Sequence, residues 1–185
     1  MSEHIDTLIH PDWVVPVLPH DVVLERYSVA LSGGRIAALL PRDEARALAA
    51  EQEIELPGQV LLPGLVNCHG HAGMSLLRGY ADDEPLMPWL ERHIWPAEGA
   101  HVSEDFVGAG TELAIAEMIR AGTTTFSDMY FFPNVVATTA QRLGIRCQIT
   151  FPIFDFPTAW GRDADDYISK GLAVRDDFKH SELVN

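Results

Sequence analysis

The hydrophobic and polar residues of this chain follow different patterns on the two sides of residue 60. On the N-terminal side, the apolar runs WVVPV, VVLERYSVAL and RIAALLP are short and rich in β-branched residues, which is typical of strands. The two glycines of SGGR, at residues 32–35, indicate a hairpin between two such runs. The pattern therefore predicts a strand-rich segment over residues 1–60, with a short polar helix or turn from Asp43.

Beyond residue 60, strands alternate with helices. An apolar strand leads to His69 and His71, and two further strands are expected in TTTFSDMYF and IRCQITFPIF, at residues 123–131 and 145–154. Helices are expected at residues 103–122, 134–144 and 163–178, and ELVN at the end of the sequence begins a fourth strand. Ser103 and Gly122 are the N-cap and the C-terminal glycine of the first helix. This alternation predicts βαβ units and a parallel sheet.

A long connection, residues 72–102, separates the first of these strands from the first long helix. Short helical pieces are expected in it only around residues 86–93. Long connections in compact domains are usually functional. In a (β/α)8 barrel this one would lie at the C-terminal ends of the strands, where active sites form.

The sequence CHGHAG places two histidines two positions apart at the end of the apolar strand. Because side chains alternate between the faces of a strand, His69 and His71 should point the same way, ~6–7 Å apart, with Asn67 on the same face. Two neutral imidazoles so placed can converge on one ion such as zinc or iron. The alternative is a chance pair of exposed histidines.

Composition narrows the class of partner. The 185 residues carry 13 Lys and Arg against 27 Asp and Glu, a formal charge of -14, which disfavours nucleic acids and anionic membrane surfaces as partners. The N-terminal sequence lacks the pattern of a secretory signal, and no apolar run approaches the ~18 residues of a membrane span. Cys68 and Cys147 form no CxxC pair and are expected to be reduced. Together these features predict a cytoplasmic protein.

The stretches PGLVNCHGHAGMSLLRGYADDEPLMPWL and GTELAIAEMIRAGTTTFSDMYFF resemble the signature region of the amidohydrolase superfamily. Within it, the chain is similar to the branch that holds the 5-methylthioadenosine/S-adenosylhomocysteine deaminases and the triazine chlorohydrolases. The HxH pair with its PGLVN lead-in carries the superfamily resemblance. The resemblance to this branch depends on the stretch LLRGYADDEPLMPWL. That stretch does not distinguish a deaminase from a chlorohydrolase. The likeness extends over nearly the whole chain, but only to the N-terminal part of such an enzyme.

The resemblance implies an α/β fold, a partial (β/α)8 TIM-like barrel of about its first three to four strands, preceded by a small β-sandwich segment. The expected domains are residues 1–60 for the sandwich segment and residues 61–185 for the barrel portion. One divalent metal ion is implied, zinc or alternatively iron, with His69 and His71 as two of its ligands. The other ligands and the proton-shuttling residues follow later strands of the family's barrel. No catalytic residue is therefore expected within this chain, and the 185 residues alone are expected to be inactive.

The implied reaction is hydrolytic deamination of the adenine ring of 5-methylthioadenosine, S-adenosylhomocysteine or adenosine. The metal lowers the pKa of its bound water to ~7, and the resulting hydroxide attacks C6. A carboxyl group protonates the ring nitrogen, and ammonia departs. The alternatives are a chlorohydrolase, a deaminase of guanine or another heterocycle, and an inactive truncated chain. The expected binding partner is a small nucleoside substrate. The sequence is also compatible with a homo-oligomer.

Three residues are candidates for substrate binding. Glu98 follows IWPA, and the resemblance implies that its carboxylate accepts hydrogen bonds from both ribose hydroxyls, since two oxygens suit a vicinal diol; a solvated loop acid is the alternative. Trp89, together with Trp95, would line the binding site for the purine or the thioether group of the substrate. Alternatively, both side chains would pack the long connection against the barrel. Arg162 would lie near the polar tail of the substrate. Asp128 is expected to make a structural hydrogen bond rather than to orient a ligand imidazole.

Overall fold

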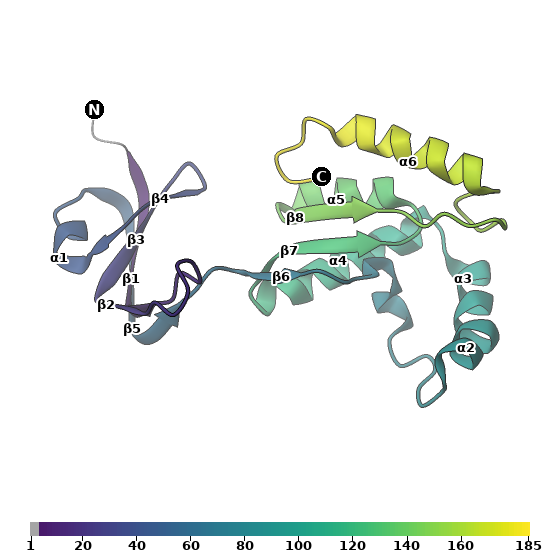
Figure 1. Ribbon diagram of the computed structural model, residues 1–185, viewed down its shortest axis with the longest axis horizontal. Coiled ribbons are helices and arrows are strands. Elements are labelled where there is room, and N and C mark those ends of the chain that lie inside the picture. The colour runs from purple at the N-terminus through teal and green to yellow at the C-terminus, as the bar shows by residue number, and fades with distance from the viewer. Residues whose placement is uncertain (1–3) are drawn as a thin grey trace. The chain divides into compact units, whose positions relative to one another are not determined.

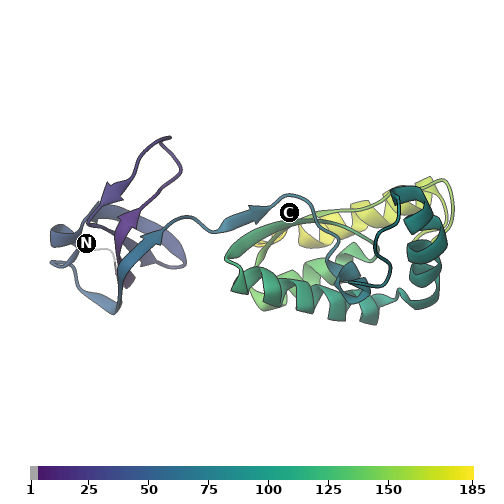
Figure 2. The same ribbon diagram turned by 90° about the horizontal axis from the view of Figure 1, so that it is seen from below.

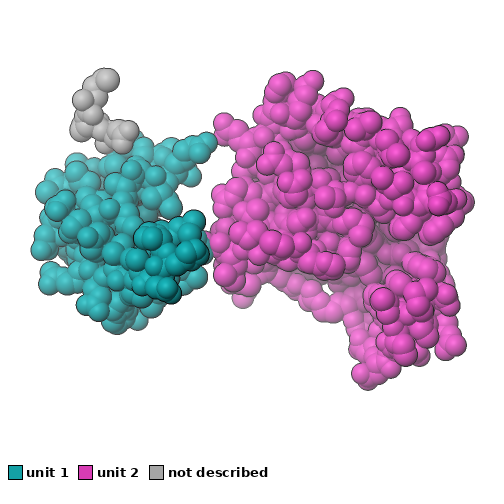
Figure 3. Space-filling view, in the orientation of Figure 1, with its two compact units in different colours: residues 1–63 teal, residues 64–185 magenta. Residues whose placement is uncertain are grey.

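In the computed structural model the chain forms two compact units, Met1–Pro63 and Gly64–Asn185, which Figure 3 shows in different colours. The structure describes residues 4–185. The predicted boundary between residues 60 and 61 falls inside the last strand of unit 1, β5 (Ala50–Leu61).

Unit 1 contains one mixed sheet and a short helix (Figure 1). Its elements are β1 (Ile5–Val14), β2 (Leu24–Glu25), β3 (Tyr27–Ser32), β4 (Arg35–Pro41), α1 (Arg42–Ala45) and β5. β1 pairs antiparallel with β2 and β3 and parallel with β5, and β3 pairs antiparallel with β4. The hairpin between β3 and β4 turns at Gly33 and Gly34, whose φ angles of 56° and 75° suit glycine. This is the hairpin that SGGR predicts. Residues 4–63 thus form one five-stranded sheet, and the predicted sandwich stays a prediction.

The position of β1 differs from the prediction. The strand already begins at Ile5, so most of it precedes the WVVPV run. Polar residues between its apolar positions hid the strand in the sequence. Leu8 and His10 are nevertheless fully buried, because β1 is a central strand with partners on both sides.

Unit 2 is built from alternating strands and helices. They are β6 (Leu65–Asn67), the 3-10 helix η1 (Ala72–Leu77), α2 (Leu86–Trp89), the π-helical turn η2 (Leu90–Ile94), α3 (Trp95–His101), α4 (Glu104–Arg120), β7 (Thr123–Met129), α5 (Pro133–Leu143), β8 (Arg146–Thr150) and α6 (Ala164–Phe178). The strands form a parallel sheet in the order β6-β7-β8. Val184 continues this order beyond β8 through a parallel bridge to Cys147. The predicted parallel sheet is confirmed, as is the start of a fourth strand.

Helices α4 and α5 pack on one face of this sheet (Figure 2). Their buried residues Ile115 and Val136 join Phe126 of β7 and Cys147 of β8 in one hydrophobic core. The opposite face is more open: Met129, at the end of β7, is 42% exposed. A sheet with helices on its outer face is the arrangement of a barrel wall, with the helices forming the outer ring.

The predicted N-cap of α4 is confirmed, and the ends of α5 and α6 lie within one residue of the predicted helix bounds. The Ser103 side chain accepts a 3.2 Å hydrogen bond from Phe106 N at the start of α4. Gly144 ends α5 with a φ of 76°. Asp163 accepts a 3.0 Å bond from Asp166 N at the start of α6. None of the helices within residues 4–185 combines the length and the apolar character needed to cross a bilayer.

The long connection contains more helix than the sequence indicates. Helical turns run from Leu86 to His101 through α2, η2 and α3. Pro88 and Pro96 interrupt the sequence pattern, but each lies in the first turn of a helix, or close to it, where proline is tolerated. The connection is therefore a set of packed turns that can position side chains.

Candidate active site

The two histidines of the HxH pair lie side by side in a turn beyond β6. The strand ends at Asn67, whose side-chain oxygen accepts a 3.1 Å hydrogen bond from His69 N and so turns the chain. The ring centroids of His69 and His71 are 5.2 Å apart, and the ring planes meet at 76°. The turn, rather than the alternation of a strand, thus brings the rings together.

Three hydrogen bonds attach this turn to the C-terminal end of β7. Met129 N donates to the carbonyl oxygen of Gly70 over 3.2 Å. The Nδ1 atom of His71 donates to the carbonyl oxygen of Met129 over 2.7 Å, and Ala72 N donates to Oδ1 of Asp128 over 2.5 Å. The turn is consequently fixed by the neighbouring strand of the sheet.

The bond to Met129 determines which nitrogen of His71 can bind a metal. A carbonyl oxygen only accepts, so a neutral His71 imidazole carries its proton on Nδ1 and has its lone pair on Nε2. An imidazole whose other nitrogen donates to a carbonyl is the usual arrangement of a metal-binding histidine.

The spacing of the rings fits a shared ion. Two imidazoles bound tetrahedrally to one zinc ion, at ~2.0–2.1 Å from each nitrogen, place their ring centroids roughly 5 Å apart. The observed separation of the His69 and His71 centroids is 5.2 Å. These two residues therefore fit two positions of a zinc site.

Further ligands for such an ion are not found close to the pair in the described part of the chain. Two groups of three candidate side chains occur there, and both belong to unit 1. One consists of His4, Asp6 and Glu51, and the other of His10, Glu53 and Glu55. Neither includes His69 or His71.

Asp128 supports the turn rather than a ligand imidazole. Its carboxylate is 2% exposed and bonds to the backbone of Ala72. Burial raises the pKa of Asp128 to about 6, and the bond from Ala72 N opposes this shift. The carbonyl oxygen of Met129 takes the place next to His71. This is the structural hydrogen bond expected from the sequence.

A cavity of about 320 Å³ adjoins His71 of the pair. It is lined by His71 and Met74 of the turn and η1, by residues of the long connection, and by the segments that follow β7 and β8. Those of the connection include Leu86, Trp89, Leu90, Ile94, Trp95 and Glu98. A candidate metal ligand, two indoles and a carboxylate thus line the same largely apolar cavity.

The carboxylate of Glu98 is held by a tyrosine at the end of β7. The Tyr130 hydroxyl donates a 2.8 Å hydrogen bond to Oε1 of Glu98. Burial raises the pKa of Glu98, while the Tyr130 bond and the nearby His71 act in the opposite direction. Burial, together with the charge of Glu98, raises the pKa of Tyr130, so the phenol keeps its proton and remains the donor.

The structure places the other predicted substrate residues as follows. Trp89 lines the cavity, and its indole Nε1 donates a 2.9 Å hydrogen bond to Ala81 O, so it both faces the space and anchors the connection. Arg162 is exposed, pairs with Asp166 at 3.4 Å, and is not among the residues that line the cavity.

Sequence reasoning missed the role of Tyr130 beside Glu98. A signal was present, because Phe126, Asp128 and Tyr130 alternate along TTTFSDMYF. All three are buried, with exposures of 1%, 2% and 5%. The polar members of such an alternating set require partners.

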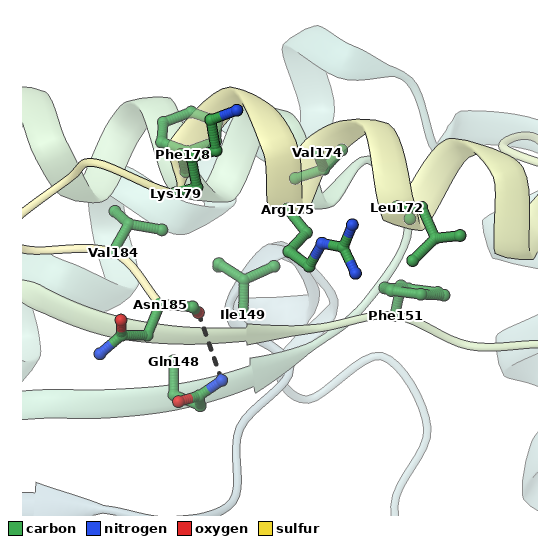
Figure 4. Close-up of a pocket in the computed structure, with 11 residues that line it drawn as sticks. Gln148, Ile149, Phe151, Leu172, Val174, Arg175, Phe178, Lys179, Val184 and Asn185 are labelled. Carbon is green, nitrogen blue, oxygen red and sulfur yellow. Dashed lines mark hydrogen bonds between the residues drawn. The ribbon is translucent and has the colours of Figure 1, made fainter.

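A separate pocket of about 340 Å³ lies between α6 and β8 (Figure 4). Figure 4 shows Ile149 and Phe151 on one side and Leu172 and Val174 of α6 on the other. None of the predicted site residues lines it.

The parallel sheet and the helices outside it form part of the wall of an α/β barrel, and comparison with known proteins agrees. The amidohydrolase family profile matches residues 60–184. The chain therefore belongs to the amidohydrolase family.

Two of the relatives that are most similar in sequence are named as deaminases. The chain is 47% identical over 182 residues to the 5-methylthioadenosine/S-adenosylhomocysteine deaminase of Teredinibacter turnerae, and 49% identical over 181 residues to that of Saccharophagus degradans. The alignments cover 98% and 97% of this chain but 41% of either relative. The chain thus spans about two-fifths of the length of these relatives.

Solved structures confirm the fold. An adenosine deaminase from Xanthomonas campestris with bound zinc matches with a TM-score of 0.93 and 45% identity, over 99% of this chain and 42% of that one. The zinc-bound atrazine chlorohydrolase of Arthrobacter aurescens matches with a TM-score of 0.84 over 97% of this chain and 45% of that one. Its identity of 19% shows a shared fold alone.

Proposed function

We propose that this chain is the N-terminal part of a metal-dependent enzyme that hydrolytically deaminates the adenine ring of 5-methylthioadenosine, S-adenosylhomocysteine or adenosine. The identity to deaminases along nearly the whole chain supports this assignment. Because the chain spans about two-fifths of those relatives, the activity is proposed for the complete protein.

In this proposal His69 and His71 bind one divalent ion, zinc, through their Nε2 atoms. A bound zinc ion supplies a water molecule of lowered pKa as the nucleophile. His71 is held for this role by Met129 O, and the turn is held by Asp128. The remaining ligands and the proton-transferring groups belong to the rest of the enzyme.

The observation that carries the choice of a nucleoside is the presence of Glu98 and His71 in one cavity. With Oε1 bound to Tyr130, the second oxygen of Glu98 and the remaining lone pairs are available to a ligand. A ribose diol offers two donors to such a carboxylate, and charge-assisted bonds of this kind are strong. Trp89 and Trp95 would contact the purine or the thioether, and Arg162 is given no part.

The test uses the complete protein. We expect ammonia release from adenosine and S-adenosylhomocysteine, lost on chelation and restored by zinc. Glu98→Ala should raise KM for adenosine far more than for the free base adenine. Glu91→Ala, which removes an exposed glutamate of the same connection, is the matched control and should leave both KM values unchanged. An equal effect of Glu98→Ala on nucleoside and base would contradict the nucleoside assignment.

A chlorohydrolase is the competing function, since such an enzyme shares this fold. Its substrates have no ribose, so the buried Glu98 would lack a diol partner. Release of chloride from atrazine without ammonia release from adenosine would favour this competitor.

A further inference from the structure

Tyr130 lies between the two functional parts of the cavity. Its ring centroid is 6.5 Å from that of His71, and its hydroxyl bonds to Glu98 over 2.8 Å. Glu98 comes from α3 in the long connection, whereas Tyr130 directly follows β7. One side chain thus connects the metal-binding turn with the carboxylate proposed to bind ribose.

The ring of Tyr130 is tightly packed. A Cβ atom added to Gly73 would lie 2.8 Å from its Cε1 atom, closer than real contacts allow. The ring of Phe131 packs on it with a centroid distance of 5.0 Å. Because the ring packs closely against Gly73 and Phe131, the position of its hydroxyl is set by the core of unit 2.

The carboxylate of Glu98 depends on this hydroxyl for its orientation. A glutamate side chain rotates about several bonds and must be restrained to present one oxygen to a ligand. In residues 4–185 Tyr130 supplies the hydrogen bond to this side chain, which is 9% exposed and therefore has little contact with water. Without that bond, the buried carboxylate would lack a hydrogen-bond donor and could adopt another rotamer.

We propose that Tyr130 is a positioning residue, whose hydroxyl fixes Oε1 of Glu98 so that Oε2 faces the ribose diol of the substrate. The inference rests on the proposed nucleoside deaminase function. Tyr130 does not touch the reacting atoms, so it should affect recognition of the diol and leave the chemical step unchanged.

The test compares two substrates with the complete enzyme. Adenosine carries the diol, and 2′,3′-dideoxyadenosine lacks it. Tyr130→Phe keeps the ring and removes one hydroxyl. We expect it to raise KM for adenosine about tenfold, the effect of losing about one hydrogen bond to a charged group. Its kcat should stay within about twofold of the wild type, and its KM for the dideoxy substrate should not change.

Tyr167→Phe is the matched control. Tyr167 is also buried, and its hydroxyl bonds to Thr158 Oγ1 over 2.7 Å in a purely structural contact. This variant should lower the melting temperature without changing either KM. The double variant Y130F/E98A should show the KM of E98A alone, because the two residues act through one contact.

The outcomes separate this inference from the proposed function. A wild-type enzyme that does not prefer adenosine to the dideoxy substrate contradicts the proposed function. If wild type and E98A behave as proposed, three results of Y130F overturn the positioning role alone. They are an equal rise of KM for both substrates, a fall in kcat with KM unchanged, and failure of the variant to fold, which would give the hydroxyl a structural role.

Discussion

The imidazole of His71 and the carbonyl group of Met129 are joined by a 2.7 Å hydrogen bond that bridges 58 positions of the sequence. The bond engages Nδ1 of His71 with β7, so that Nε2 is the nitrogen left for another partner. A candidate metal ligand on one strand end is thus prepared by the backbone of the next strand.

Loss of a histidine of the pair should remove the metal. We expect His71→Ala to lower the affinity of the complete protein for zinc by at least 10–100-fold, since even indirect support of a ligand has effects of this size. Metal content after dialysis against a weak chelator measures this. His180→Ala, at an exposed histidine after α6, should retain the wild-type content. Equal metal content in both variants would exclude His71 as a ligand.

Asp128 should stabilise the turn. In Asp128→Ala the buried Ala72 N–H loses its acceptor, which costs about 1–3 kcal/mol of the free energy of unfolding. Asp128→Asn keeps an oxygen in place and should be affected less. Thermal melting checks the order, with Asp155→Ala at an exposed aspartate as the control. Melting of Asp128→Ala at the wild-type temperature would show that the bond is dispensable.

Two glycines of α4 should respond oppositely to alanine. A Cβ on Gly110 would lie 2.3 Å from Gly73 O, so Gly110→Ala must displace η1 and should destabilise by about 1–3 kcal/mol. A Cβ on Gly108 would meet only Val135 at an ordinary 3.5 Å. Gly108→Ala should therefore stabilise the helix, by up to about 1 kcal/mol. Denaturant unfolding of both variants tests the pair, and equal midpoints would contradict the close packing of α4 on η1.

The cysteines should differ in reactivity. Burial raises the pKa of the Cys147 thiol, and the charge of Asp128 adds to this shift. A raised pKa lowers the fraction of reactive thiolate at any given pH. At pH 8, iodoacetamide should therefore modify the exposed Cys68 and leave Cys147 unmodified until denaturant is added. Peptide mass spectrometry measures the two rates, and similar rates under native conditions would contradict the burial of Cys147.

The sequence was sufficient where the determining interactions are local. Ser103, Gly144 and Asp163 mark helix ends, because a capping side chain or a left-handed glycine acts within one turn. The SGGR hairpin is local in the same sense. The resemblance carried by HxH likewise uses a short motif, although its assignment to a metal stays a prediction.

What the sequence could not supply depends on distant contacts. The partner of Glu98 is Tyr130, 32 positions away, and no local pattern connects them. The buried strand β1 was obscured for the same reason, since its burial comes from strands on both sides. The helical turns of the long connection were hidden by prolines whose position within each helix only the fold reveals.

The three bonds between the turn at Gly70–Ala72 and the end of β7 have a consequence for biosynthesis. The ribosome makes the two histidines long before it makes Met129, so the nascent chain carries the imidazoles without the groups that orient them. The two imidazoles take their final orientation only after the chain between the turn and β7 has folded and the three bonds have formed. The rate of this step is limited by the entropy lost when the two chain segments come together. Ion uptake at this turn would therefore report on the docking of two successive barrel units during synthesis.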